Sequence, residues 1–254
     1  MLTILPIPAF EDNYIWLIHN GRHAVAVDPG EAEPVRSFLR REGLNLAAIL
    51  ATHHHGDHTG GIGDLLQDRA VPVYGAVRGP LAPQTTPVAE GDLITVPELP
   101  ATFGVLAFPG HTRDHVGFTL PGALFCGDTL FGIGCGRLFE GTPEQALASL
   151  KKILALPDDT LIYCAHEYTL ENIRFAKKVE SGNPDLLQWE AAAQALRKSG
   201  RPTVPTTLAL EKSANPFLRF EAPDVIRAAS IHAGRPLNAP VEVFAAVRAW
   251  RDGA

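Results

Sequence analysis

Three features are scarce in this sequence of 254 residues, and each scarcity argues against a class of protein. Three cysteines, Cys126, Cys135 and Cys164, are too few, and odd in number, for a disulfide framework. No run approaches the roughly 18 consecutive apolar residues of a membrane span, and residues 1–6 lack the features of a signal peptide. Basic residues are not in surplus, since the net charge is -6, which argues against a nucleic-acid binder. We therefore expect a cytoplasmic protein with neither a nucleic-acid nor a membrane partner.

Enough apolar sequence is present for a folded core. Hydrophobic residues make up 46% and charged residues 20% of the chain, both near globular averages. Short β-prone runs bounded by Gly, Pro or Asp fill the first two-thirds, and helical patterns follow residue 166. Strands followed by helices predict an α+β fold. We expect one domain over residues 1–166 and a helical domain over residues 167–254.

The individual elements follow from the same patterns. Strands are expected over residues 13–18, 24–27, 46–50, 71–73, 93–96, 103–108, 116–120, 123–125 and 161–164. Helices are expected over residues 34–41, 59–67, 143–156, 169–181, 184–198, 223–232 and 240–251. Asn20-Gly21 between the first two strands predicts a hairpin.

The strongest chemical signal is the run His53-His54-His55-Gly56-Asp57-His58. It follows a predicted strand, and residues two apart in a strand point to the same side, so His53 and His55 can grip one metal ion while His54 points away. The chain then turns at Gly56, which lets Asp57 and His58 face a second ion from the start of the next helix. Imidazole and carboxylate together suit zinc, iron or manganese.

Three further candidate ligands, His111, Asp128 and His166, each follow a predicted strand beside small residues. Together with the four residues above they make seven ligands, too many for one tetrahedral ion and suited to two ions that share a carboxylate and a hydroxide. Cys126 and Cys164 precede two of these ligands by two positions, and we interpret them as buried packing residues.

These motifs, with others along the sequence, resemble those of a known family. Residues 52–58 (THHHGDH) resemble the signature of the metallo-β-lactamase superfamily. Further blocks are similar to glyoxalase II, the hydroxyacylglutathione hydrolase branch: residues 108–112, 125–131, 134–142, 166–169 and 215–219. The resemblance implies an αβ/βα four-layer sandwich with a C-terminal helical domain.

The resemblance also implies a site and a reaction. The first metal ion would take His53, His55 and His111, the second would take Asp57, His58 and His166, and Asp128 would bridge them. We expect two divalent ions, most simply Zn²⁺, with iron and manganese as alternatives. A hydroxide shared by the ions would attack S-D-lactoylglutathione, or a related 2-hydroxyacyl thioester, and release glutathione and D-lactate in methylglyoxal detoxification. Asp57 is a candidate proton acceptor.

Four residues are implied as substrate contacts. Arg137 stands where the family often has lysine, and Phe139 where some members have tyrosine. Tyr168 follows the last metal histidine, and Arg219 ends the motif Asn-Pro-Phe-Leu-Arg. A second basic residue shortly after Arg219 is missing, because Phe220-Glu221-Ala222 follows. We expect a monomer whose partner is a small glutathione thioester.

Three other interpretations are open. A persulfide dioxygenase of the same superfamily needs only three ligands and one iron, and a lactonase or β-lactamase needs none of Arg137, Tyr168 and Arg219. A non-catalytic metal-stabilised binding protein would tolerate a missing ligand. The complete set of seven ligands favours the thioester hydrolase over the dioxygenase and the binding protein, and the presence of Arg137, Tyr168 and Arg219 favours it over a lactonase or β-lactamase.

Overall fold

The computed structural model describes residues 2–75 and 85–254, and these form two units. Unit 1 comprises Met1–Phe108 and Asp114–Gly127, and unit 2 comprises Pro109–Arg113 and Asp128–Ala254. The chain therefore leaves unit 1 for five residues, returns, and leaves again after Gly127. Each unit has its own apolar core.

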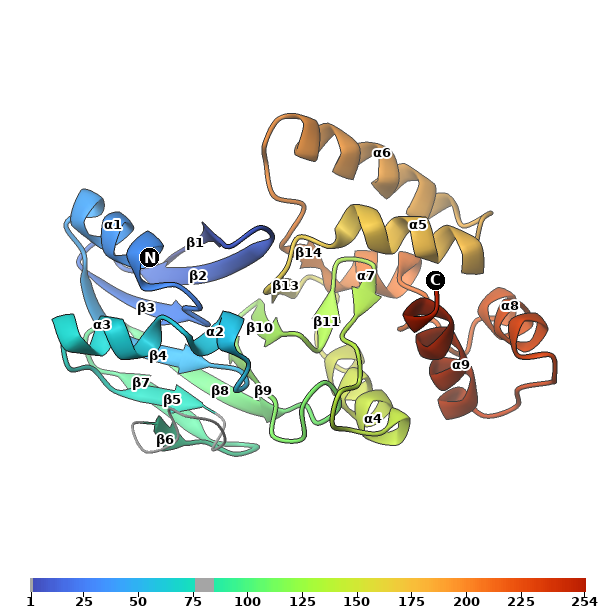
Figure 1. The fold of residues 1–254 in the computed structure, drawn as a ribbon, viewed down its shortest axis with the longest axis horizontal. Coiled ribbons are helices and arrows are strands. Elements are labelled where there is room, and N and C mark those ends of the chain that lie inside the picture. The colour runs from blue at the N-terminus through green and yellow to red at the C-terminus, as the bar shows by residue number, and fades with distance from the viewer. Residues whose placement is uncertain (1, 76–84) are drawn as a thin grey trace. The chain divides into compact units, whose positions relative to one another are not determined.

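The first sheet of unit 1 combines a hairpin meander with parallel strands (Figure 1). Its strands are β1 (Thr3–Ala9), β2 (Asn13–His19), β3 (His23–Val27), β4 (Asn45–Ala51), β5 (Val73–Gly75) and β6 (Thr85–Pro87). They lie in chain order, with β1, β2 and β3 antiparallel and β3 to β6 parallel. The predicted turn joins β2 to β3: Asn20 Oδ1 accepts hydrogen bonds from the amides of Arg22 and His23, and Gly21 has a φ of 90°.

The central strands are apolar along their length because both of their faces are covered. Six consecutive residues of β2 and six of β4 are buried. On one face, helices α1 (Ala32–Glu42) and α3 (Ile62–Asp68) supply Val35 and Leu65 to a core that also contains Leu17 and Ile49. A short helix, α2 (Gly56–Thr59), precedes α3.

Four antiparallel strands complete unit 1. They are β7 (Leu93–Val96), β8 (Ala101–Ala107), β9 (Val116–Leu120) and β10 (Ala123–Gly127), each paired with the next. The start of β9 meets the end of β4, since the amide of Val116 donates to the carbonyl of Thr52. A Cβ on Gly127 would lie 2.3 Å from Thr52 Oγ1, so only glycine fits there. This close approach positions the residues that follow β4.

Unit 2 is mainly helical. It contains β11 (Leu130–Phe131), β12 (Gly134–Cys135), α4 (Pro143–Leu154), β13 (Leu161–Cys164), α5 (Thr169–Val179), α6 (Pro184–Lys198), β14 (Thr206–Thr207), α7 (Leu208–Ala214), α8 (Pro223–Ala233) and α9 (Pro240–Asp252). Four of these helices, α4, α6, α8 and α9, begin with proline, whose fixed φ suits the first turn. Thr142 and Gln145 form a capping box at the start of α4.

The structure departs from the predicted elements in a few places. β1 was not predicted, and the helix expected over residues 59–67 is two helices, because Thr59 ends α2 and α3 starts at Ile62. The strand expected over residues 71–73 is shifted to Val73–Gly75, and α7 was not predicted. Among the described residues, no helix is both long and apolar enough to cross a membrane.

Candidate metal centre

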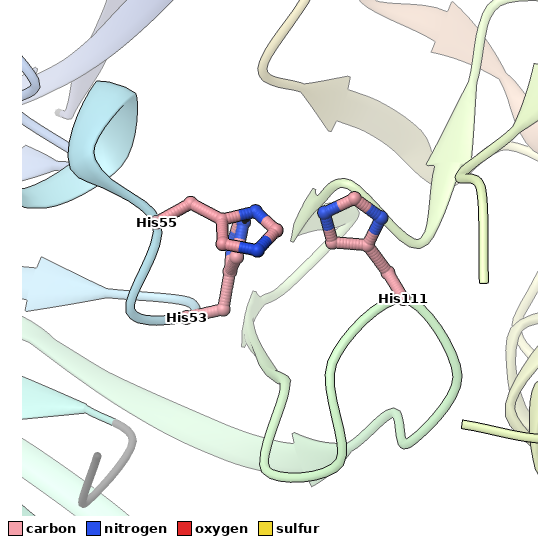
Figure 2. A group of neighbouring side chains, drawn as sticks. All are labelled: His53, His55 and His111. Carbon is pink, nitrogen blue, oxygen red and sulfur yellow. Dashed lines mark hydrogen bonds between the residues drawn. The ribbon is translucent and has the colours of Figure 1, made fainter. Parts of the chain in front are cut away.

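His53 and His55 follow β4 and face each other, as their spacing predicts. His53 Nε2 lies 3.0 Å from His55 Nδ1 (Figure 2). His53 is fully buried, and His55 is partly exposed. His54 instead faces Asp114, with 3.5 Å between Nδ1 and Oδ1. The pair therefore presents two imidazole nitrogens to one point, which is what a metal ion requires.

Outer contacts fix which nitrogen of His53 carries the lone pair. The amide and hydroxyl of Thr52 donate to the two oxygens of Asp28, at 2.7 and 2.8 Å. Because the Thr52 hydroxyl hydrogen is used on Asp28, its oxygen can accept from His53 Nδ1, 3.0 Å away. That leaves Nε2 of His53 as the ligand atom, oriented by an outer partner as metal-binding histidines are.

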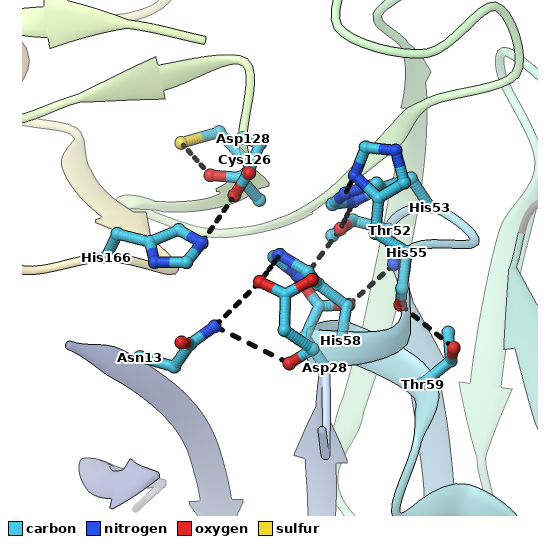
Figure 3. A network of polar contacts seen from close by, with 12 residues as sticks. Asn13, Asp28, Thr52, His53, His55, His58, Thr59, Cys126, Asp128 and His166 are labelled. Atoms are coloured by element: carbon cyan, nitrogen blue, oxygen red, sulfur yellow. Dashed lines mark hydrogen bonds and ion pairs between the residues drawn. The ribbon is translucent and has the colours of Figure 1, made fainter. Parts of the chain in front are cut away.

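Asp57 and His58 lie in the first turn of α2, as predicted. His58 is fully buried, and its Nδ1 lies 3.1 Å from Asp28 Oδ2, so the same carboxylate orients it (Figure 3). His58 Nε2 lies 3.3 Å from Asp57 Oδ2. Asn13 Nδ2 donates to that carboxylate at 3.1 Å. Asp57 and His58 thus form a second pair of ligand atoms in unit 1.

Unit 2 holds a carboxylate whose two oxygens face different histidines. Asp128 Oδ2 lies 3.4 Å from Nε2 of His111. Figure 3 shows the other contact, in which Asp128 Oδ1 lies 3.5 Å from Nε2 of His166. All three residues are buried. His111 Nδ1 lies 2.8 Å from the carbonyl of Arg137, which can only accept, so Nδ1 carries the proton and Nε2 the lone pair. This geometry is that of a carboxylate able to bridge two ions.

The donor set fits divalent transition metals. Unit 1 offers the imidazoles of His53, His55 and His58 and the carboxylate of Asp57, and unit 2 offers the imidazoles of His111 and His166 and the carboxylate of Asp128. Neutral imidazole and carboxylate are the ligands of zinc, iron and manganese sites. The set implies divalent metal ions bound by histidine and aspartate.

The three cysteines are not among these candidate metal ligands. Cys126 and Cys164 are fully buried and Cys135 nearly so, which agrees with the predicted packing role. Burial raises the pKa of the Cys164 thiol to about 12 and also raises the pKa of Cys135.

Residues that the sequence did not single out complete the site. Asp28 was interpreted only as the end of a strand, yet it orients both His53, through Thr52, and His58. His115 is fully buried and stacks on His53 with ring centroids 4.7 Å apart. The one sequence signal for Asp28 is a carboxylate beside Pro29-Gly30 at the end of an apolar run, which also describes many turns.

Two of the four predicted substrate residues line one cavity of unit 2. The cavity has a volume of about 250 Å³ and includes Arg137, Tyr168 and Phe131 in its walls. The Tyr168 ring stacks on the His166 imidazole, with centroids 4.7 Å apart and planes within 7°. The cavity therefore begins one ring away from a candidate metal ligand.

Two arginines of α9, which the sequence did not single out, line the same cavity. Arg248 is 8% exposed, and its Nη1 donates to the carbonyl of Cys135 at 2.7 Å. Arg251 Nη2 donates to Glu171 at 2.6 Å. Their spacing of three residues puts them on one side of the helix, and a nearly buried arginine is unusual. That spacing was the available signal, but the sequence does not show which side of α9 faces the cavity.

The other two predicted substrate residues have different surroundings. Phe139 is 61% exposed, and its ring lies edge-on to His111 at 5.2 Å. Arg219 donates from Nε and Nη2 to the two oxygens of Glu180, at 2.7 and 2.9 Å, which raises the pKa of the guanidinium. It lines a separate cavity with Asp224 and not the cavity of Tyr168. A glutathione contact by Arg219 stays a prediction.

Comparison with known proteins decides the family. The model of the metallo-beta-lactamase superfamily matches residues 9–166, and the model of the hydroxyacylglutathione hydrolase C-terminus matches residues 167–254. The chain is 50% identical over 252 residues to the hydroxyacylglutathione hydrolase of Nitrosomonas eutropha, covering 99% of each chain. The chain belongs to the hydroxyacylglutathione hydrolase family of the metallo-beta-lactamase superfamily. This confirms the predicted family.

Solved structures of the superfamily agree with the fold. ETHE1 from Myxococcus xanthus is 29% identical, with a TM-score of 0.65, covering 99% of this chain and 98% of that one. The structure titled TTHA1623 in a di-iron-bound form is 28% identical, with a TM-score of 0.61, covering 84% of this chain and 100% of that one. The predicted α+β metallo-β-lactamase fold with a C-terminal helical region is confirmed.

Proposed function

We propose that this chain hydrolyses S-(2-hydroxyacyl)glutathione, chiefly S-D-lactoylglutathione, to glutathione and D-lactate, and so removes methylglyoxal. The observation that carries this proposal is the stacking of Tyr168 on His166. It joins an arginine-lined cavity, suited to the carboxylates of glutathione, to a candidate metal ligand. Relatives about 50% identical over their full length carry the name hydroxyacylglutathione hydrolase.

The proposed metal centre uses all seven predicted ligands. One ion would be held by His53, His55 and His111 and the other by Asp57, His58 and His166, and Asp128 would be shared between them. Zinc is the simplest occupant, and iron or manganese suit the same donors. When bound, two such cations lower the pKa of a water molecule between them and polarise the thioester carbonyl.

The chain's own groups supply orientation and proton transfer. Asp28 and the carbonyl of Arg137 hold His58 and His111 with Nε2 turned toward the site. The Asp57 side chain is 41% exposed and is the carboxylate that we assign as proton acceptor. The leaving group is a thiolate, and with a thiol pKa near 8.5 it needs little help from a general acid.

Glutathione would occupy the cavity of unit 2. Arg137, Arg248 and Arg251 suit its carboxylates, and Tyr168 can donate a hydrogen bond. Phe139 lies beside His111 and offers apolar contact but no hydrogen bond. Arg219 is the fourth proposed contact, and it would have to exchange its partner Glu180 for the substrate.

The proposal extends to the setting of the reaction. We propose a cytoplasmic monomer with residues 1–166 as the metal-binding domain and residues 167–254 as the glutathione-binding domain. It would bind neither nucleic acid nor membrane, in keeping with its net charge of -6. Light scattering on the purified protein tests the monomer.

The deciding experiment follows hydrolysis of S-D-lactoylglutathione by metal-analysed protein, with chelator-treated protein alongside. We expect turnover with about two metal ions per chain, lost after chelation. Two bound ions without turnover would remove glutathione thioesters as substrates. One iron per chain with oxygen uptake on glutathione persulfide would replace the hydrolase by a dioxygenase.

A further inference from the structure

The turn between β11 and β12 is held by three side chains from two helices. Asn172 of α5 donates to the carbonyl of Gly132 at 3.1 Å, and Asn215, at the end of α7, donates to the carbonyl of Gly134 at 3.0 Å. The amide of Ile133 between them donates to Glu211 of α7 at 3.0 Å. The carbonyls of Gly132 and Gly134 and the amide of Ile133 therefore each have a side-chain partner.

Ile133 has a backbone conformation that it would not adopt unaided. Its φ is 57°, in the left-handed region, which is a genuine outlier for a β-branched residue. Such a conformation persists only where the surroundings impose it. Ile133 is fully buried and its amide donates to the Glu211 carboxylate, so this hydrogen bond helps to hold the conformation, together with those of Asn172 and Asn215 on either side.

Glu211 carries a carboxylate at a buried position, where packing alone would favour an apolar side chain. It is fully buried, and it accepts hydrogen bonds from the Ile133 amide, the Thr206 hydroxyl at 2.7 Å and the Asn215 amide at 2.8 Å. Burying a carboxylate is costly unless hydrogen bonds compensate. Three donors converge on its two oxygens, so this residue is retained for accepting hydrogen bonds and not for filling space.

The hairpin connects this buried contact to the proposed active site. Just before the turn, the Phe131 ring lies edge-on to Tyr168 at 5.3 Å and to His166 at 5.7 Å. Just after it, the carbonyl of Cys135 accepts from Arg248. A displacement of Ile133 would therefore move the walls of the cavity.

We propose that Glu211 is a positioning residue for glutathione binding: by fixing Ile133 in its left-handed conformation it sets the hairpin that carries Phe131 and Cys135. The inference rests on the proposed function for the identity of the ligand. Its reach is the cavity more than the metal centre, because the hairpin ends at Cys135, before Arg137, whose carbonyl orients His111.

The test is the isosteric variant Glu211→Gln. An amide offers one acceptor and two hydrogens to three donors, so at least one contact becomes a clash between donors. We expect the KM for S-D-lactoylglutathione and the Kd for glutathione to rise about tenfold, the effect of one lost hydrogen bond. We expect kcat to change less than about twofold and the metal content to stay at wild type, since the ligands are intact.

Two further variants provide a matched control and an independent test. Glu190→Gln is the matched control, since Glu190 pairs with Lys177 and contacts no residue of the hairpin among the described interactions. It should leave KM and Kd unchanged. Thr206→Val keeps the size of its side chain and removes one donor to Glu211. It should raise Kd in the same direction by about threefold, and it replaces Glu211→Gln if that protein does not fold.

The outcomes separate the two proposals. Wild-type protein that binds glutathione but does not hydrolyse the thioester refutes the proposed function, while the Kd comparison still decides the role of Glu211. A folded Glu211→Gln protein with wild-type KM and Kd but a lower free energy of unfolding overturns the positioning role and leaves Glu211 purely structural. Wild-type protein that does not bind glutathione overturns both.

Discussion

At the scale of single residues, Asp28 organises more of the site than any group that the sequence singled out in unit 1. One buried carboxylate accepts from the Thr52 amide and hydroxyl and faces His58 Nδ1. It thus fixes the ring orientation of both His53 and His58. The ligands themselves could be predicted because their residue types and spacing are specific, whereas Asp28 could not, because its role depends on contacts 24 and 30 residues away.

Replacing Asp28 by asparagine should weaken metal binding. The amide nitrogen of asparagine cannot accept from Thr52 or His58, so one of these orienting contacts is lost. We expect the affinity for at least one ion to fall about 10–100-fold, as for other outer-sphere partners of ligating histidines. A metal-competition titration measures this, with the exposed Asp159→Asn as control. Equal affinities for the Asp28 variant and the wild type would contradict the assignment.

A second prediction at the scale of single residues concerns Glu211 and the pH dependence of the free energy of unfolding. Burial raises its pKa to about 7 from an ordinary 4.5. A raised pKa in the folded state means that the stabilisation is fully present below pH 4.5 and is lost as the pH rises through 7. The loss corresponds to about 3 kcal/mol. Urea unfolding at pH 5 and pH 8 should show this loss in wild-type protein and not in Glu211→Gln, and parallel pH profiles would refute it.

At the scale of elements, α9 is where the sequence interpretation was least complete. The helix itself was predicted, and it begins and ends within one residue of the expected range. What could not be predicted is that Arg248 and Arg251 turn toward a cavity, because that depends on how α9 packs in unit 2. The motif that ends in Arg219 was visible in the sequence, but its bidentate partner Glu180 lies 39 residues away.

Replacement of Arg251 and replacement of Arg219 should affect different properties of the protein. Arg251→Ala should raise the KM for the thioester about tenfold, through loss of a charged contact, with little change in the free energy of unfolding. Arg219→Ala should lower the free energy of unfolding by about 2 kcal/mol, because it leaves the buried Glu180 without its partner. Steady-state kinetics and urea unfolding measure both, with the exposed Arg227→Ala as control. A large rise in KM for Arg219→Ala alone would restore the predicted contact.

Two other elements show how local rules are overridden. β1 contains Pro6 and Pro8, which argue against a strand, yet it pairs only with β2 at the edge of the sheet, where proline is tolerated. Gly60 and Gly61 lie between α2 and α3, within the helix expected over residues 59–67, and a Cβ on Gly61 would lie 2.5 Å from the backbone of residues 31 and 32, so only glycine fits there. Only the packed structure reveals such a close approach.

At the scale of the whole molecule, the proposed ligands come from both units. Unit 1 supplies His53, His55, Asp57 and His58, and unit 2 supplies His111, Asp128 and His166. The family and fold could be predicted because motifs characteristic of the family occur in the family's order along the chain. The boundary at residue 166 stays a prediction, and the two units divide the chain differently because residues 109–113 belong to unit 2.

Metal removal should therefore destabilise the protein as a whole. A ligand that binds only the folded state at 1,000 times its Kd contributes about 4 kcal/mol. We expect a chelator to lower the Tm by roughly 10 °C and added zinc to restore it. Scanning calorimetry measures this, and Asp128→Asn, which lacks the proposed bridge, should respond less. An unchanged Tm in a protein shown to have lost its metal would contradict a dimetal centre.

The burial of all three cysteines has a consequence for resistance to oxidation. Thiol–disulfide exchange requires a thiolate, and burial raises the pKa of the Cys164 thiol to about 12, so this thiol is protonated at neutral pH. Cys126 is equally inaccessible, and Cys135 is nearly buried with a raised pKa. An enzyme that releases glutathione at every turnover works among thiols and their disulfides. This chain should neither become glutathionylated nor lose activity in oxidised glutathione, so that it keeps working when oxidative stress shifts that pool.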